Sequence, residues 1–202
     1  MDSGFRLQRC AAGALWALLV LLAVSWPAFA DDGKSLTGML LIAGDDVEDA
    51  DFADSVVLVL NNLGPAPAGI IINKPMQVAV SQLFPKLKRL AKSQDKVYFG
   101  GPVEFGTVWF LFRASTQPEH AVRACDGVYL SADPELLLKL LNRDKPMDGL
   151  RIFVGHSGWA PGQLEEEIGR GDWALKRAES DNIFNGNSEH PWPAPQAPKR
   201  TT

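Results

Sequence analysis

The sequence is poor in cysteine, histidine and clustered positive charge. It has 2 cysteines and 3 histidines in 202 residues, and no C-x-x-C or H-x-x-H pair. Such sparse, scattered ligands cannot supply a structural zinc site. The 20 Lys and Arg against 24 Asp and Glu give a net charge of −4 without the basic cluster of a nucleic-acid-binding surface. We therefore expect no metal site and no direct contact with nucleic acid.

Nucleotide-binding and hydrolase motifs are absent as well. No GxxxxGK[ST] or GxGxxG run occurs, so we expect no nucleotide cofactor and, more broadly, no cofactor. The letters GHSGW at 155–159 are close to a G-x-S-x-G nucleophile elbow, but Trp159 stands where the second glycine must allow close backbone approach. The only later histidine is His190, in a Pro-rich segment. Ser157 is therefore not expected to be a nucleophile, and no catalytic residue is predicted.

The N-terminal segment has the pattern of an export signal. Arg6 and Arg9 precede an uncharged apolar run, and Ala28-Phe29-Ala30 fits the small-residue cleavage site. This predicts a signal peptide over residues 1–30, cleaved after Ala30, and a periplasmic or secreted protein. The alternatives are an uncleaved leader that anchors the chain to the membrane, and a cytoplasmic protein whose start is misassigned.

Cleavage would leave one thiol, Cys125, because Cys10 departs with the leader. A lone cysteine is most often buried. Arg123 lies two residues away and would favour a thiolate, whereas Asp126 would oppose it. A redox-responsive protein that uses Cys125 therefore stays an alternative function.

Hydrophobic patterning predicts a β-rich domain over residues 31–184. Seven strands are expected, at 39–43, 55–60, 69–73, 97–100, 108–113, 127–131 and 150–155, in a sheet covered on both faces or curled on itself. Helices are expected over 81–92, after the capping Asp133, over 162–169, and from Asp172 through Leu175. The acidic run 45–51 lacks the spacing of a calcium loop and is interpreted as solvated. Residues 185–202 are rich in proline and are expected to form a disordered tail.

Three of these strands end in loops rich in Gly and Pro: INKP at 72–75, FGGP at 99–102 and HSGWAPGQ at 156–163. If the strand ends meet, they form a rigid niche that offers an amide, an ammonium, a hydroxyl and an indole. The candidate ligand-binding residues are Asn73, Lys74, Gly100, Gly101, Ser157, Gly158, Trp159 and Gln163. The alternative is that these glycines and prolines only turn the chain tightly where Trp159 packs.

Six blocks, in the same order, resemble the YqgE/AlgH family of bacterial proteins. They are LTGMLLIA (36–43), FADSVVLVL (52–60), GIIINKP (69–75), VYFGGPV (97–103), GVYLS (127–131) and SGWAPGQLEEEI (157–168). The resemblance implies an α+β fold in which a mixed, bifurcated β-sheet curls into a pseudo-barrel with flanking short helices. It implies no established reaction or cofactor, and the family name comes partly from a proposed regulatory role. This chain differs at His156, where members usually carry an aromatic residue, and in its leader, since most members are cytoplasmic.

The sequence therefore predicts a non-enzymatic binding or accessory domain, exported, with an unknown protein or small molecule as partner. A cytoplasmic, transcription-related regulatory protein, as proposed for the family, is the alternative alongside the Cys125-based one.

Overall fold

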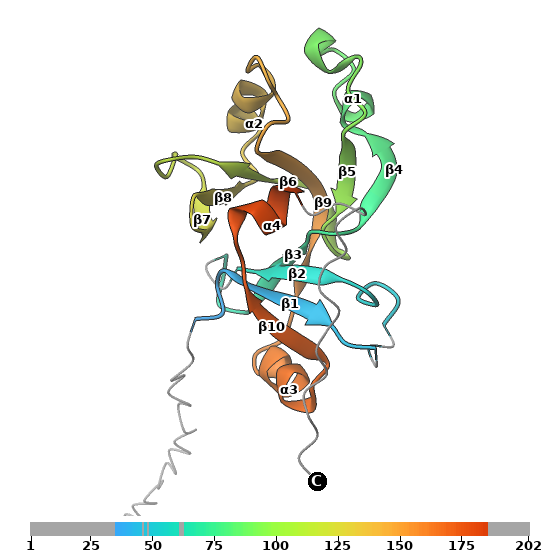
Figure 1. The fold of residues 1–202 in the computed structure, drawn as a ribbon, viewed down its shortest axis with the longest axis vertical. Helices are drawn as coiled ribbons and strands as arrows, with labels where there is room; N and C mark the ends of the chain where they lie inside the picture. Colours follow the sequence, from blue (N-terminus) through green and yellow to red (C-terminus); the bar gives the residue numbers. More distant parts are fainter. Residues whose placement is uncertain (1–34, 46, 48, 61–62, 186–202) are drawn as a thin grey trace, which may run out of the picture. The chain divides into compact units, whose positions relative to one another are not determined.

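The computed structural model describes residues 35–45, 47, 49–60 and 63–185, and the statements below concern these residues (Figure 1). The predicted signal peptide and residues 186–202 of the predicted tail lie outside them. No helix in the described ranges is long and apolar enough to span a bilayer.

A ten-stranded sheet dominates the described chain. Its strands are β1 (Met39–Ala43), β2 (Val56–Val59), β3 (Ala68–Ile71), β4 (Pro75–Ala79), β5 (Lys96–Phe99), β6 (Val103–Arg113), β7 (Val122–Cys125), β8 (Val128–Ser131), β9 (Leu150–Gly158) and β10 (Trp173–Arg177). The order is β10-β1-β2-β3-β9-β6-β8-β7, with β4 and β5 off this path. Short helices flank the sheet: α1 (Val80–Leu83), the 3-10 turn η1 (Lys88–Leu90), α2 (Pro134–Leu141), α3 (Gln163–Arg170) and α4 (Ser180–Asn185).

The sheet divides along β9. One edge of β9 pairs with β6 in antiparallel fashion. On the other edge, Ile152–Val154 pairs in parallel with β5, and Ser157 and Gly158 pair antiparallel with β3. The sheet is thus mixed and bifurcated, it curls into a half-barrel, and the implied α+β fold is confirmed.

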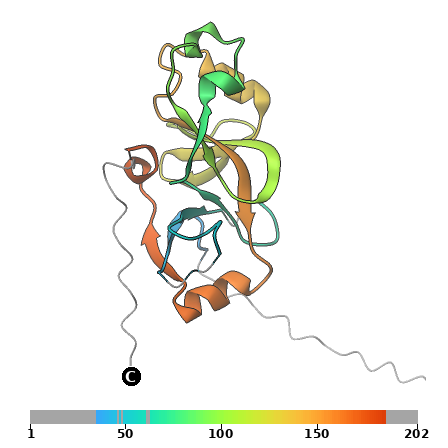
Figure 2. The ribbon, with the colours of Figure 1, turned by 90° about the vertical axis from the view of Figure 1, so that its right-hand side faces the viewer.

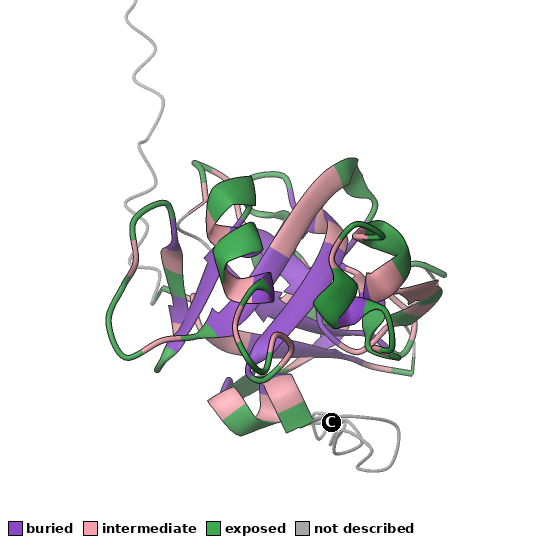
Figure 3. Cartoon of the chain, turned by 90° about the horizontal axis from the view of Figure 1, so that it is seen from above, coloured by how far each residue is buried: buried purple, intermediate pink, exposed green. Residues whose placement is uncertain are grey.

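The strands β1, β2, β3 and β8 are buried on both faces. On β1, Leu40 points into one apolar cluster with Phe153, whereas its neighbour Leu41 points into another with Trp159. A third cluster lies under α2, through Leu137. Figure 3 shows the buried strands between helices whose outer faces are exposed. Figures 1 and 2 place α3 at one end of the sheet and α1 and α2 at the other. Burial on both faces explains why the predicted strands read as unbroken apolar runs.

The helix expected from Asp172 through Leu175 is wrong, because these residues lead into β10. Trp173 pairs with Ala43 and Leu175 with Leu41, so the segment completes the sheet beside β1. Trp173 is buried while Leu175 is 43% exposed at the sheet edge. Tertiary pairing has overridden the local cap signal.

The helix expected over 81–92 is also wrong in extent. It is split into α1 and η1, with Phe84 closing α1 and Pro85 directly after it. Pro85 has no backbone N–H to continue the helix ladder, so the chain turns there. The helix after Asp133 is confirmed, since the Asp133 carboxylate accepts from the Leu136 N–H at 2.7 Å. Four elements were not expected, namely β4, β7, β10 and α4, and β6 begins five residues earlier than the predicted strand at 108–113.

Candidate functional site

Glycines allow the end of β5 to cross β9 where the sheet divides. A Cβ atom on Gly101 would lie 2.3 Å from the carbonyl carbon and oxygen of His156, and one on Gly100 would lie 2.3 Å from the Gly155 oxygen. Gly101 and Gly155 also have positive φ, of 144° and 70°. These positions hold backbone against backbone, so the space between them is closed to a ligand.

The Ser157 hydroxyl belongs to the same crossing. It is fully buried and donates to the carbonyl of Gly100 at 3.3 Å. That carbonyl also accepts from the Ile71 N–H at 2.9 Å, so one oxygen joins β3, β5 and β9. Ser157 therefore links the strands through a hydrogen bond and has no surface open to a substrate.

Asn73 and Lys74 hold the acidic loop before β2. The Asn73 side chain accepts from the Val56 N–H and donates to the Asp54 carbonyl, both at 2.8 Å. The Lys74 ammonium donates to the carbonyl oxygens of Asp51 at 2.8 Å and Ala50 at 3.3 Å. The amide and the ammonium of the predicted niche are thus engaged with loop backbone.

The other three candidate residues line a pocket of about 380 Å³, called here the indole pocket. Its lining residues are Val47, Asp49, Phe52, Gly158, Trp159, Gln163, Glu167, Arg170, Asp172 and Trp173. The structure therefore divides the eight predicted niche residues into three groups: Gly158, Trp159 and Gln163 at the pocket, Gly100, Gly101 and Ser157 at the closed crossing, and Asn73 and Lys74 under the loop.

A single carboxylate organises the indole pocket. Glu167 Oε2 accepts from the indole N–H of Trp159 at 2.9 Å and from that of Trp173 at 2.8 Å. Its other oxygen accepts from the Gln163 amide at 2.8 Å. The Gln163 carbonyl in turn accepts from the Ala160 N–H, which fixes the loop ahead of α3. The three hydrogen bonds to one carboxylate orient both indole rings.

Three aromatic rings surround this carboxylate. Phe52 lies 6.2 Å from Trp159 and 5.9 Å from Trp173, measured between ring centroids, and the two indoles are 6.4 Å apart in an edge-to-face arrangement. Both indoles are 95% buried, whereas Asp49, Gln163 and Arg170 are exposed around them. The pocket thus has an aromatic base and a polar rim.

Sequence reasoning did not single out Phe52, Glu167 or Trp173 as site residues. Trp173 was expected in the helix from Asp172 through Leu175. The available signal was the spacing of four from Gln163 to Glu167 in a predicted helix, which places both side chains on one face.

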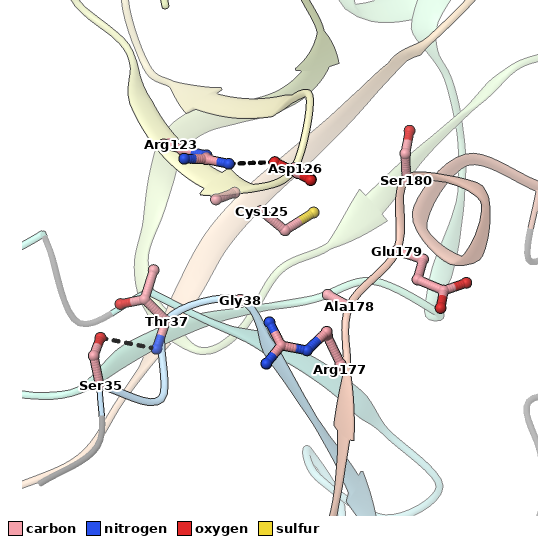
Figure 4. Close-up of a pocket in the computed structure, with 11 residues that line it drawn as sticks. Ser35, Thr37, Gly38, Arg123, Cys125, Asp126, Arg177, Ala178, Glu179 and Ser180 are labelled. Carbon is pink, nitrogen blue, oxygen red and sulfur yellow. Dashed lines mark hydrogen bonds and ion pairs between the residues drawn. The ribbon is translucent and has the colours of Figure 1, made fainter.

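A second cavity, of about 800 Å³, lies between the end of β7 and the segment that follows β10 (Figure 4). Cys125 and the Arg177 guanidinium both face this space, and Arg123 pairs with Asp126. Burial, reinforced by the Asp126 charge and only partly opposed by Arg123, raises the pKa of the Cys125 thiol to about 11. The thiol is therefore kept neutral, which disfavours the thiolate that redox chemistry requires.

His156 lies apart from both cavities. Its Nδ1 is 3.9 Å from a Glu104 carboxylate oxygen and has no hydrogen-bond partner among the described residues. Its ring meets Trp109 edge to face at 5.9 Å. Within the described chain, no cluster of three or more His, Cys, Asp or Glu side chains could hold a metal ion.

Comparisons with known proteins agree with this architecture. The family model described as AlgH-like (DUF179) matches residues 40–197. The UPF0301 protein ML0028 of Mycobacterium leprae is 32% identical over 163 residues, which cover 77% of this chain and 78% of the relative. A UPF0301 protein of Parabacteroides distasonis is 31% identical over 166 residues, which cover 80% of this chain and 82% of the relative.

Two solved structures are similar as well. The crystal structure of protein DIP2367 from Corynebacterium diphtheriae has a TM-score of 0.60 and 29% identity, and covers 76% of this chain and 81% of its own. The solution structure of the AlgH protein from Pseudomonas aeruginosa has a TM-score of 0.62, covers 76% and 82%, and at 22% identity shows the shared fold. The resemblance predicted from the sequence blocks is confirmed: the chain belongs to the AlgH-like family.

Proposed function

We propose that this chain is a non-enzymatic, exported binding domain that receives its ligand in the indole pocket. The observation that carries the proposal is the clamp of both indole N–H groups on Glu167 Oε2. A concave site with aromatic walls and a few fixed polar groups is the usual form of a small-ligand site. Because the rings are already oriented, little conformational freedom would be lost on binding.

The chemistry of the pocket suits binding better than catalysis. Glu167 is engaged by three donors, and Asp172 is paired with Arg170 at 2.6 Å. The hydroxyl of Ser157 is buried in the strand crossing, and Cys125 lies in the other cavity with a raised pKa. None of these groups is an activated nucleophile next to a free base.

Two phenylalanines give a matched test. Phe52→Ala removes the partly exposed wall of the indole pocket, whereas Phe105→Ala removes a ring that is 52% exposed outside it. A panel of small metabolites is screened for ligands that raise the melting temperature of the full chain, and each active compound is repeated on both variants. We expect the shift to disappear in Phe52→Ala and to persist in Phe105→Ala. Equal shifts in the two variants would show that the ligand binds elsewhere.

A further inference from the structure

We propose that the indole pocket binds an organic cation with N–H donors, namely a guanidinium or primary ammonium group on an apolar stem. The proposal rests on the function proposed above and names the class of ligand.

The charge around the indole pocket is the first argument. Three carboxylates line it, those of Asp49, Glu167 and Asp172, against one guanidinium, that of Arg170. Arg170 is already held by Asp172. The loop that carries Asp49 adds the exposed carboxylates of Asp45, Asp51 and Asp54, and Lys74 is the cation beneath it. A positive ligand is therefore favoured and an anionic one is opposed.

The aromatic base is the second argument. The N–H edges of both indoles, which are the positive rims of those rings, are directed at Glu167. The rings line the pocket with hydrocarbon surface, of which the partly exposed Phe52 offers most and the 95% buried indoles little, and the negative charge of an aromatic π-face attracts cations. An apolar stem would pack on the same surface.

The remaining acceptors favour a cation that can donate hydrogen bonds. Arg170 donates a hydrogen bond to Asp172 Oδ2, and the Asp51 N–H donates one to Asp49 Oδ1. In the described part of the chain, no donor reaches the second oxygen of either carboxylate. A guanidinium stacks on aromatic faces and binds carboxylates through its N–H groups. A primary ammonium also donates to carboxylates, but it acts as a point charge. An inorganic ion lacks a suitable ligand cluster among the described residues.

The test uses the ¹⁵N-labelled full chain and follows the indole N–H resonances of Trp159 and Trp173, assigned through the two Trp→Phe variants. The probes are butylguanidinium and butylammonium, with butylurea as the neutral analogue of the same shape and calcium chloride as the inorganic cation. We expect saturable shifts of both resonances with the two organic cations, and binding of butylurea at least about tenfold weaker.

A charge-neutral variant locates the effect. Asp49→Asn keeps the oxygen that accepts from Asp51 but removes one charge from the rim. It should weaken butylguanidinium binding about threefold to tenfold, whereas Glu119→Gln, at an exposed carboxylate outside the indole pocket, should leave it unchanged.

Three results would overturn the inference. Equal binding of butylurea and butylguanidinium would mean an apolar pocket without charge selectivity, and a response to calcium alone would mean an inorganic site. Resonances that no probe moves would mean that this class of ligand is wrong. None of these three results tests the proposed binding function itself. That function is tested by the two phenylalanine variants, and it is contradicted if Phe52→Ala and Phe105→Ala respond alike.

Discussion

At the scale of single residues, the two side chains with the most familiar chemistry are both restrained. The Ser157 hydroxyl donates to the Gly100 carbonyl where β5 crosses β9, and its side chain has no exposed surface. Cys125 faces a cavity, but its surroundings hold it as a neutral thiol. Neither group is therefore placed for chemistry, and in the function we propose the indoles and their carboxylate recognise the ligand.

The Cys125 thiol gives a pH-dependent prediction. Its pKa rises from the ordinary value of 9.0 to about 11, because burial and the Asp126 charge both disfavour the thiolate. At neutral pH it should be about 100-fold less ionised than an ordinary thiol and alkylated correspondingly slowly. Iodoacetamide labelling of Cys125 in the native chain as a function of pH, read from the peptide that contains it, measures this. The rate should keep increasing beyond pH 9, with its midpoint near pH 11.

Denatured protein supplies the control for this measurement, since its cysteines should label with a midpoint near the ordinary pKa. Asp126→Asn should move the native midpoint downward, because the second contribution to the shift is removed. Rapid native labelling at pH 7 would contradict the assignment and restore the redox-responsive alternative.

At the scale of elements, Glu167 joins α3 to β9 and β10. It lies on α3, Trp159 directly follows β9, and Trp173 begins β10. Glu167→Ala would leave two indole N–H groups without their acceptor in a region that is 95% buried. Each unsatisfied buried donor costs about 1–3 kcal/mol, so we expect a loss of roughly 2–4 kcal/mol in the free energy of unfolding. Urea denaturation measures it.

Glu166→Ala, one position earlier on the exposed side of α3, is the matched control and should change the unfolding free energy by less than about 0.5 kcal/mol. Glu167→Gln should lie between the two, because its amide oxygen still accepts while the charge is gone. If Glu167→Ala and Glu166→Ala are equally stable, the clamp does not hold these elements together.

The elements also show which parts of the fold can be read from sequence. Strands such as β2, buried on both faces, are continuous apolar runs and were predicted. β10 was not, because Lys176 and Arg177 at the sheet edge break its alternation and Asp172 resembles a helix cap. The glycines in the sequence pointed to the candidate loops. However, Gly101 allows close backbone contact, whereas Trp159 lines the indole pocket, and this difference arises only from the division of the sheet at β9. That division is a long-range pairing with no local signal.

At the scale of the whole molecule, the predicted niche depended on three strand ends meeting, and curvature decides how they do so. The ends of β3, β5 and β9 do converge, through the Gly100 carbonyl, but their backbones are too close to leave a space. The open pocket forms one turn further on, where the loop after β9 meets α3, β10 and the acidic loop. Sequence patterning named three of the ten residues that line this pocket, Gly158, Trp159 and Gln163, because Phe52 and Trp173 reach it only through the folding of the loop before β2 and of β10.

Export is the prediction that concerns the chain as a whole. The pattern of Arg6, Arg9 and Ala28-Phe29-Ala30 predicts cleavage after Ala30, so the mature protein should begin at Asp31 and be found in the periplasm. A chain with one remaining thiol, kept neutral by its surroundings, is suited to an oxidising compartment, because oxidation proceeds through the thiolate. Cell fractionation with N-terminal sequencing measures both the location and the start.

An Ala30→Arg variant should block cleavage and leave a longer, membrane-retained chain, which distinguishes a processed leader from a misassigned start. A cytosolic protein with residues 1–30 intact would contradict export. Periplasmic protein that begins at Asp31 would separate the mature chain from DNA, so that any regulatory effect would have to pass through a ligand or partner in that compartment. The acidic, aromatic indole pocket is the site on the described chain at which we expect that partner to be recognised.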